Sequence, residues 1–191
     1  MSDHGFHVHG PHDHELEHAA QGHGDGFTNK IAMFTAIIAT VGAIFGYMGG
    51  ATQANAGLYK NNAAIKKTEA SNQWNYYQAK SSKQNLSELA LELAPSAKRD
   101  YYNEQIERYK AEKADIKKAA EKLEAESLQW DEQSDTQMHQ HHRWAQATTL
   151  LQVAIALAAI ALLTRKQWLQ FAMYGAGTLG LGVGVLAALH V

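Results

Sequence analysis

The chain has 191 residues, room for one or two domains, and a formal net charge of −2 at pH 7. This charge balance provides no basic surface of the kind that binds nucleic acid. The lack of cysteine excludes disulfides, thiol catalysis and cysteine-based zinc sites. The mean hydropathy of −0.36 is typical of a soluble protein, but it averages three apolar blocks with the polar sequence around them.

Residues 1–27 form a tail that holds seven of the eleven histidines. We expect this tail to be disordered, because no large apolar residues recur in it at a regular spacing. It has no basic n-region, so we do not expect it to be a signal peptide. Imidazoles bind zinc, nickel and copper. The tail is therefore a candidate metal site, with a solvated tail as the alternative, and the candidate ligands are His4, His7, His9, His12, His14, His18 and His23.

Three apolar blocks, at residues 28–50, 147–163 and 168–191, have about the length that crosses a bilayer. We predict a transmembrane helix in each, with a short basic loop at 164–167 between the last two. Tyr47, Trp144 and Trp168 stand near block ends, where interfacial aromatic residues are common. A globular protein with three buried core helices is the alternative, but little else in the chain could cover them.

Residues 51–146 are polar and have the composition of long helices, with Pro95 as the natural turning point of a hairpin. Seven-residue spacings in both arms predict an antiparallel coiled coil. We expect Leu93 to face Tyr102, and this register places Ile65 opposite Trp130. The predicted contact residues are Leu58, Ile65, Asn72, Ala79, Leu86 and Leu93 in the first arm, and Tyr102, Tyr109, Ile116, Leu123, Trp130, Gln137, Trp144 and Leu151 in the second.

Trp74 and Tyr77 fall on the outer face of the hairpin in this register. Their expected neighbours, Glu121 and Lys118, could not cover the rings. Exposed aromatic patches commonly mark contact surfaces, so we predict a subunit interface at Trp74 and Tyr77. A ligand or partner site, or rings lying along their own hairpin, are the alternatives.

The run EASNQWNYYQAKSSKQNL, with YKNNAAIKKT upstream, resembles an uncharacterised bacterial membrane-protein family, domain of unknown function 4337. The resemblance extends from the first span through the hairpin to the last spans and leaves out the tail. It implies a bacterial inner-membrane protein with a helical extramembrane segment. It implies no assigned activity and no catalytic residues.

Small residues recur every four positions in two of the predicted spans, and such ladders let helix backbones approach closely. Chance recurrence in a Gly- and Ala-rich sequence is the alternative. The predicted helix-packing residues are Gly42, Gly46 and Gly50 in the first span, and Ala172, Ala176, Gly180, Gly184 and Ala188 in the third. Apart from Lys30 and His190 at their outer ends, the spans contain no Asp, Glu, Lys, Arg or His, which argues against a proton-coupled transporter.

Asp135, His139 and His142 share one helix face, but no fourth metal ligand is evident, so a solvated or interfacial cluster is favoured. No arrangement of a nucleophile with a base, phosphate-binding loop or carboxylate pair stands out from the charged helices. We therefore expect no enzymatic activity.

The sequence thus predicts an all-α membrane protein with three transmembrane helices and a long antiparallel coiled-coil hairpin between the first and second. We expect a homo-oligomeric structural or scaffold protein of the bacterial inner membrane that contacts the lipid bilayer and binds no nucleic acid. Metal handling through the tail and an oligomeric channel are the alternatives. Lys30, Arg165 and Lys166 lie at the same end of the spans and favour a cytoplasmic N-terminus and a periplasmic hairpin.

Overall fold

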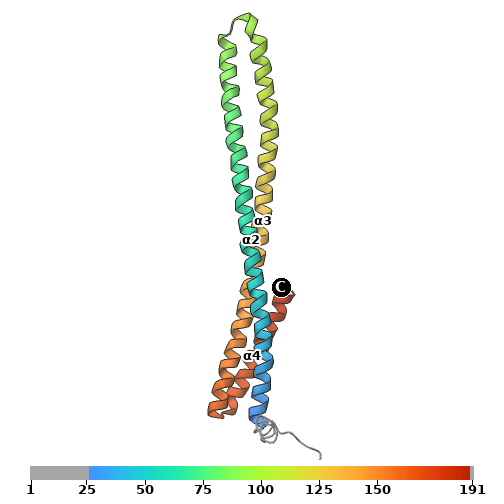
Figure 1. Ribbon diagram of the computed structural model, residues 1–191, viewed down its shortest axis with the longest axis vertical. Helices are drawn as coiled ribbons and strands as arrows, with labels where there is room; N and C mark the ends of the chain where they lie inside the picture. Colours follow the sequence, from blue (N-terminus) through green and yellow to red (C-terminus); the bar gives the residue numbers. More distant parts are fainter. Residues whose placement is uncertain (1–25, 190–191) are drawn as a thin grey trace, which may run out of the picture. The chain divides into compact units, whose positions relative to one another are not determined.

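The computed structural model describes residues 26–189, and the histidine-rich tail lies outside this range. The described chain folds into three helices, α2 (Gly26–Leu93), α3 (Ser96–Thr164) and α4 (Gln167–Ala188) (Figure 1). The predicted all-α fold is confirmed. Each of the three helices contains a segment long and apolar enough to cross a membrane.

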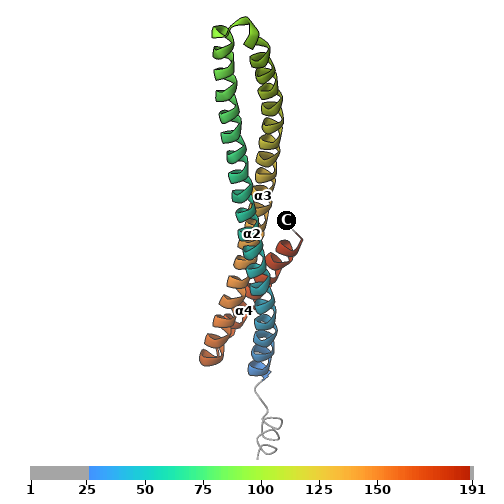
Figure 2. The same ribbon diagram turned by 45° about the horizontal axis from the view of Figure 1, so that its top comes forward.

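Helices α2 and α3 contribute to two compact units. The hairpin unit comprises residues 48–142. The apolar unit comprises the described residues of the segments 26–47 and 143–189. In the hairpin unit, the arms of α2 and α3 run antiparallel and stay side by side in both views (Figures 1 and 2).

The hairpin turn is short because Pro95 ends one helix and starts the next. Proline disfavours a helical conformation in the residue before it and cannot donate a backbone hydrogen bond, so α2 ends at Leu93. Helix α3 begins directly afterwards at Ser96, and the Lys98 amide donates to the Pro95 carbonyl at 2.9 Å. Only Ala94 and Pro95 lie between the two helices.

Small side chains on α2 let the arms approach closely. The Ser127 and Ser134 hydroxyls donate across to the backbone carbonyls of Ala63 and Ala56, each at 2.9 Å. One heptad further along, His141 Nδ1 lies 2.8 Å from the Gly49 carbonyl oxygen. Pro95 is the midpoint in sequence of all three pairs. Residues at seven-residue spacing from Gly49 therefore form one row of the α2 contact, namely Gly49, Ala56, Ala63, Ala70, Tyr77, Gln84 and Leu91.

The expected contact on α3 is present, whereas the expected contact on α2 is wrong. On α3, Ile116 and Trp144 are buried and the other predicted hairpin positions are half-buried. On α2, all six predicted residues, from Leu58 to Leu93, are exposed. The reason is the turn: facing Leu93 with Tyr102 requires a longer loop than Ala94–Pro95. In the structure, Trp130 packs against Tyr59, with ring centroids 5.5 Å apart and the rings tilted by 38°, and not against Ile65.

The apolar unit is built around two clusters of buried side chains that join all three helices. Ile31, Ala158 and Met173 belong to the first cluster, and Ile38 and Leu151 belong to the second. Thr35 and Thr148 donate their hydroxyls to carbonyls four residues earlier, so these polar groups are satisfied within their own helices. The outer surface of the unit is also apolar, with large exposed side chains that include Met33, Ile37, Ile44, Val153, Ile160, Phe171 and Leu179.

Candidate functional site: the groove between the hairpin arms

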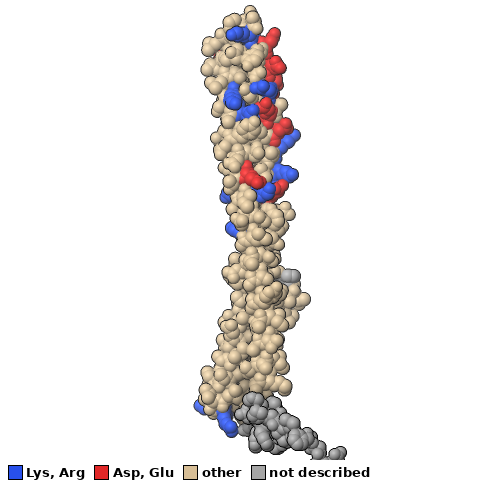
Figure 3. Space-filling model, viewed as in Figure 1, with Lys and Arg blue, Asp and Glu red and all other residues tan. Residues whose placement is uncertain are grey.

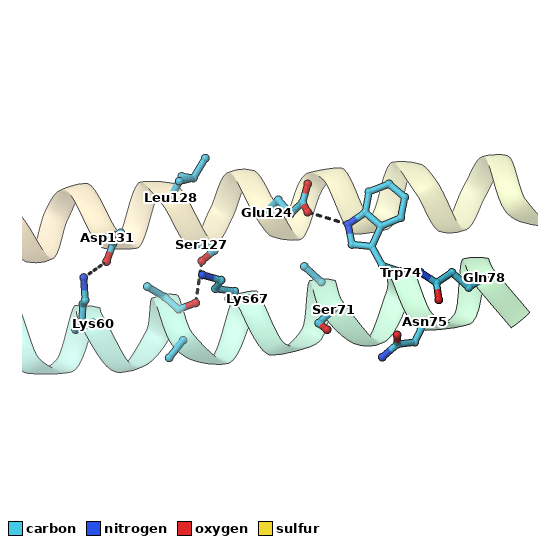
Figure 4. A pocket seen from close by; sticks show the side chains of 13 residues that line it. Lys60, Lys67, Ser71, Trp74, Asn75, Gln78, Glu124, Ser127, Leu128 and Asp131 are labelled. Carbon is cyan, nitrogen blue, oxygen red and sulfur yellow. Dashed lines mark hydrogen bonds and ion pairs between the residues drawn. The ribbon is translucent and has the colours of Figure 1, made fainter.

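A groove of about 730 Å³ runs between α2 and α3 in the hairpin unit (Figure 4). Ala63 and Ala70 are buried at its base, and Leu128 of α3 stands at its rim. The groove exists because α2 supplies small residues on this side. The Ser127 side chain, in the same region, is turned into the helix contact by its bond to Ala63. The base of the groove is therefore apolar.

Each end of the groove has one polar link between the arms. Lys60 and Asp131 form an ion pair at 2.5 Å at one end, and the hydrogen bond to Asp131 raises the pKa of Lys60 above its usual value. At the other end, Trp74 Nε1 donates to Glu124 Oε1 at 2.8 Å. Figure 4 shows both links crossing from α2 to α3. The two carboxylates at the groove ends are thus already engaged.

Lys67 lies between these two links, and its ammonium group makes no ion pair with any residue of the 26–189 range. The groove therefore combines an apolar base with one unpaired cation. A surface of this composition can accept an apolar side chain or helix edge. Its lining contains no histidine or cysteine.

Trp74 and Tyr77 lie against their own hairpin. Tyr77 belongs to the α2 contact row, and the Lys113 ammonium lies 5.1 Å from the centre of its ring. The two aromatic rings pack edge to face with centroids 5.7 Å apart. The outward orientation expected for these rings was wrong because the α2 register was wrong. A subunit interface at Trp74 and Tyr77 stays a prediction, now without that basis.

A charged layer lies next to these rings. Lys80 and Glu112 form an ion pair at 2.5 Å across the arms, and the Lys80 side chain is only 14% exposed. The hydrogen bond between them raises the pKa of Lys80 and lowers the pKa of Glu112. Both shifts favour the charged pair. A charged layer of this kind favours a single alignment of the arms, because sliding either helix would separate the charges.

The two predicted small-residue ladders have different surroundings. In α4, Gly180 and Gly184 are buried against Leu151 and Phe45, and Ala176 packs on the second cluster. Ala172 is half-buried and Ala188 is exposed. In α2, a side-chain carbon at Gly42 would lie 3.8 Å from Leu151, while one at Gly46 or Gly50 would meet nothing within 4 Å. Gly177, which the four-residue spacing missed, is buried against Phe34.

The predicted metal ligands of the tail lie outside the described residues. Within residues 26–189, no group of three His, Cys, Asp or Glu side chains is placed to hold a metal ion. Asp135, His139 and His142 are all exposed. The histidine that sequence reasoning missed is His141, which faces α2. Its signal was present, because it continues the seven-residue spacing of Ala120, Ser127 and Ser134.

Comparison with known proteins gives a family and no activity. No curated protein and no solved structure matches this chain. Residues 27–190, which span all three helices except the first residue of α2, match the family described as domain of unknown function (DUF4337). This match covers most of the chain, and the protein therefore belongs to the DUF4337 family.

Proposed function

We propose that this protein is a membrane-anchored structural protein that assembles with copies of itself and presents its hairpin outside the bilayer. The anchor is the apolar unit. Its three segments carry large apolar side chains on their outer surface as well as in their core, and lipid is the solvent that suits such a surface. Their lengths also suit a bilayer of about 30 Å.

The proposal of self-assembly rests on an uncharged surface of the hairpin. We define the α2 outer face as two exposed rows at seven-residue spacing on the side of α2 away from the Gly49–Leu91 row, which are Leu58, Ile65, Asn72, Ala79 and Leu86, and Asn61, Thr68, Asn75, Ser82 and Leu89. None of them is charged. A helix face in water is usually rich in charge, so a long uncharged face with exposed Leu and Ile is typical of a contact surface.

The α3 arm of the hairpin carries many more charged side chains than the α2 arm. Residues 96–142 of α3 carry 19 charged side chains, against eight in residues 48–93 of α2. In Figure 3, acidic side chains gather along the α3 side of the hairpin. The solvated side of the hairpin is therefore α3, and the side available for protein contact is α2.

We expect charge introduced into the α2 outer face to separate the subunits. The double variant Ile65→Glu, Leu86→Glu should be monomeric in mild detergent while its helix content stays unchanged. Light scattering coupled to size exclusion measures the mass, and circular dichroism measures the helix content. Tyr101→Glu on α3 is the control, because Tyr101 is 59% exposed, close to the 66% of Leu86, and lies outside the groove. It should stay oligomeric.

A monomeric wild-type protein would rule out self-assembly, and an oligomeric double variant would show that another surface joins the subunits. Deletion of residues 1–25 separates this proposal from metal handling by the tail. The shortened protein should keep its oligomeric mass and lose zinc and nickel binding, because it lacks all seven tail histidines.

We further propose that the hairpin is periplasmic and the N-terminus cytoplasmic, in a bacterial inner membrane. Lys30, near the start of α2, and Arg165 and Lys166, between α3 and α4, are the basic residues flanking the spans opposite the hairpin, and short basic segments favour the cytoplasmic side. Single cysteines introduced at Ser96 and Gln167 should react with an impermeant thiol reagent from opposite sides. Reaction at Ser96 only after the membrane is opened would reverse the orientation.

A further inference from the structure

The α2 outer face has the residue pattern of a second helix contact. Leu58, Ile65, Asn72, Ala79 and Leu86 recur every seven residues, and Asn61, Thr68, Asn75, Ser82 and Leu89 follow each of them by three. This is the a and d spacing of a two-stranded coiled coil. At 3.6 residues per turn, these two rows lie on the opposite side of α2 from the rows that contact α3. The helix is therefore built to pack on both sides.

The distribution of charge on the hairpin indicates that the α2 outer face packs against the α2 helix of a second copy. Within the hairpin, the α2 outer face is uncharged, whereas the outward side of α3 carries many acids and bases. An uncharged face that pairs with a charged helix would leave charges without partners. A two-fold contact of the α2 face with the same face of a second copy avoids this cost. It also avoids like charges, since Glu69 would lie across from Ala64 and Lys83 across from Gln78.

Asn72 fixes the direction and register of such a contact. We infer that two copies pair α2 against α2, parallel and in register, with Asn72 facing Asn72 of the second copy. An asparagine at an a position of a parallel pair can hydrogen-bond to its equivalent. A slip of one heptad would place the amide against Ile65 or Ala79 and leave it unpaired. Parallel pairing also follows from the proposed function, on which this inference rests, because copies anchored in one membrane point the same way.

The chain contains no cysteine, so disulfide trapping has no background. Ala79→Cys places a thiol at an a position of the α2 outer face, and Ala125→Cys places one on the far side of α3. Both alanines are exposed. In the full-length protein in membranes, mild oxidation should convert most of the Ala79→Cys protein to a covalent dimer. The Ala125→Cys protein should give several-fold less.

Register is tested by mixing two differently tagged copies, one carrying Ala79→Cys and the other Leu86→Cys. The in-register pair predicts 79–79 and 86–86 dimers in clear excess over 79–86 dimers. Equal amounts of mixed dimers, or as much dimer through Ala125→Cys as through Ala79→Cys, would overturn the inference. Mass measurement of the wild type separates the two failures: an oligomer that does not cross-link through position 79 refutes this contact alone, whereas a monomer refutes the proposed self-assembly as well.

Discussion

Replacing Gly180 with leucine should strongly destabilise the apolar unit. A side-chain carbon at Gly180 would lie 2.6 Å from Leu151 Cδ2 and 3.1 Å from Leu150 Cβ. The leucine methyl can rotate away, but Leu150 Cβ is fixed by the α3 backbone, so α4 must move. Overpacking of this kind costs about 1–3 kcal/mol. We expect the unfolding temperature in detergent, followed by tryptophan fluorescence, to fall by several degrees.

Gly182→Leu is the matched control for this variant. Gly182 lies two residues further along α4, and an added side chain there would meet nothing within 4 Å. This substitution should leave the unfolding temperature close to that of the wild type. Similar losses in the two variants would mean that leucine acts through helix composition alone, and that α4 does not pack at Gly180.

Replacing Ile116 with alanine should give the largest loss in the hairpin unit. Ile116 is 8% exposed and lies in the α3 row that faces α2. Truncation of a buried isoleucine removes transfer free energy and leaves a cavity, at a cost of about 2–4 kcal/mol. The midpoint of chemical unfolding, followed by circular dichroism, should shift to lower denaturant concentration.

Ile65→Ala makes the same chemical change on the other side of the contact. Ile65 is 47% exposed and belongs to the α2 outer face. Measured under conditions that keep the chains apart, this variant should unfold close to the wild-type midpoint. Under conditions of assembly it should weaken association instead. A large loss in separated chains would place Ile65 inside the hairpin and restore the register first expected from the sequence.

The architecture could be predicted from the sequence because it follows from composition. The lack of glycine from Leu58 to Tyr174, and of proline other than Pro95, left long helices as the reasonable interpretation. The α3 contact could be predicted because its rows contain large side chains such as Ile116 and Trp130, which a search for apolar periodicity finds directly.

The α2 register could not be found in the same way, because α2 carries two seven-residue patterns. The row that faces α3 contains the small residues Gly49, Ala56, Ala63 and Ala70, which allow close approach but supply little apolar area. The row on the other side contains the leucines, and it therefore dominates any search for hydrophobic spacing. Only the length of the turn at Ala94–Pro95 decides between them, and turn length is poorly specified by sequence.

The groove was not predictable for a related reason. It depends on residues of α2 and α3 that are adjacent only in the correct register, such as Trp74 with Glu124 and Lys60 with Asp131. An error of a few residues in the alignment of the arms exchanges every neighbour across the contact. The individual residues were visible in the sequence, but their partners were not.

Mirror pairing about Pro95 restricts how this hairpin can gain or lose residues during evolution. Removal of residues 67–73 alone would keep the same face of α2 toward α3. It would, however, shift residues 48–66 of α2 by about 10 Å along α3 and so separate them from their present partners. Removal of residues 117–123 from α3 as well would restore every remaining pair. Insertions and deletions should therefore be accepted as matched heptads in both arms, so that hairpin length changes in steps of fourteen residues, about 10 Å of reach at a time.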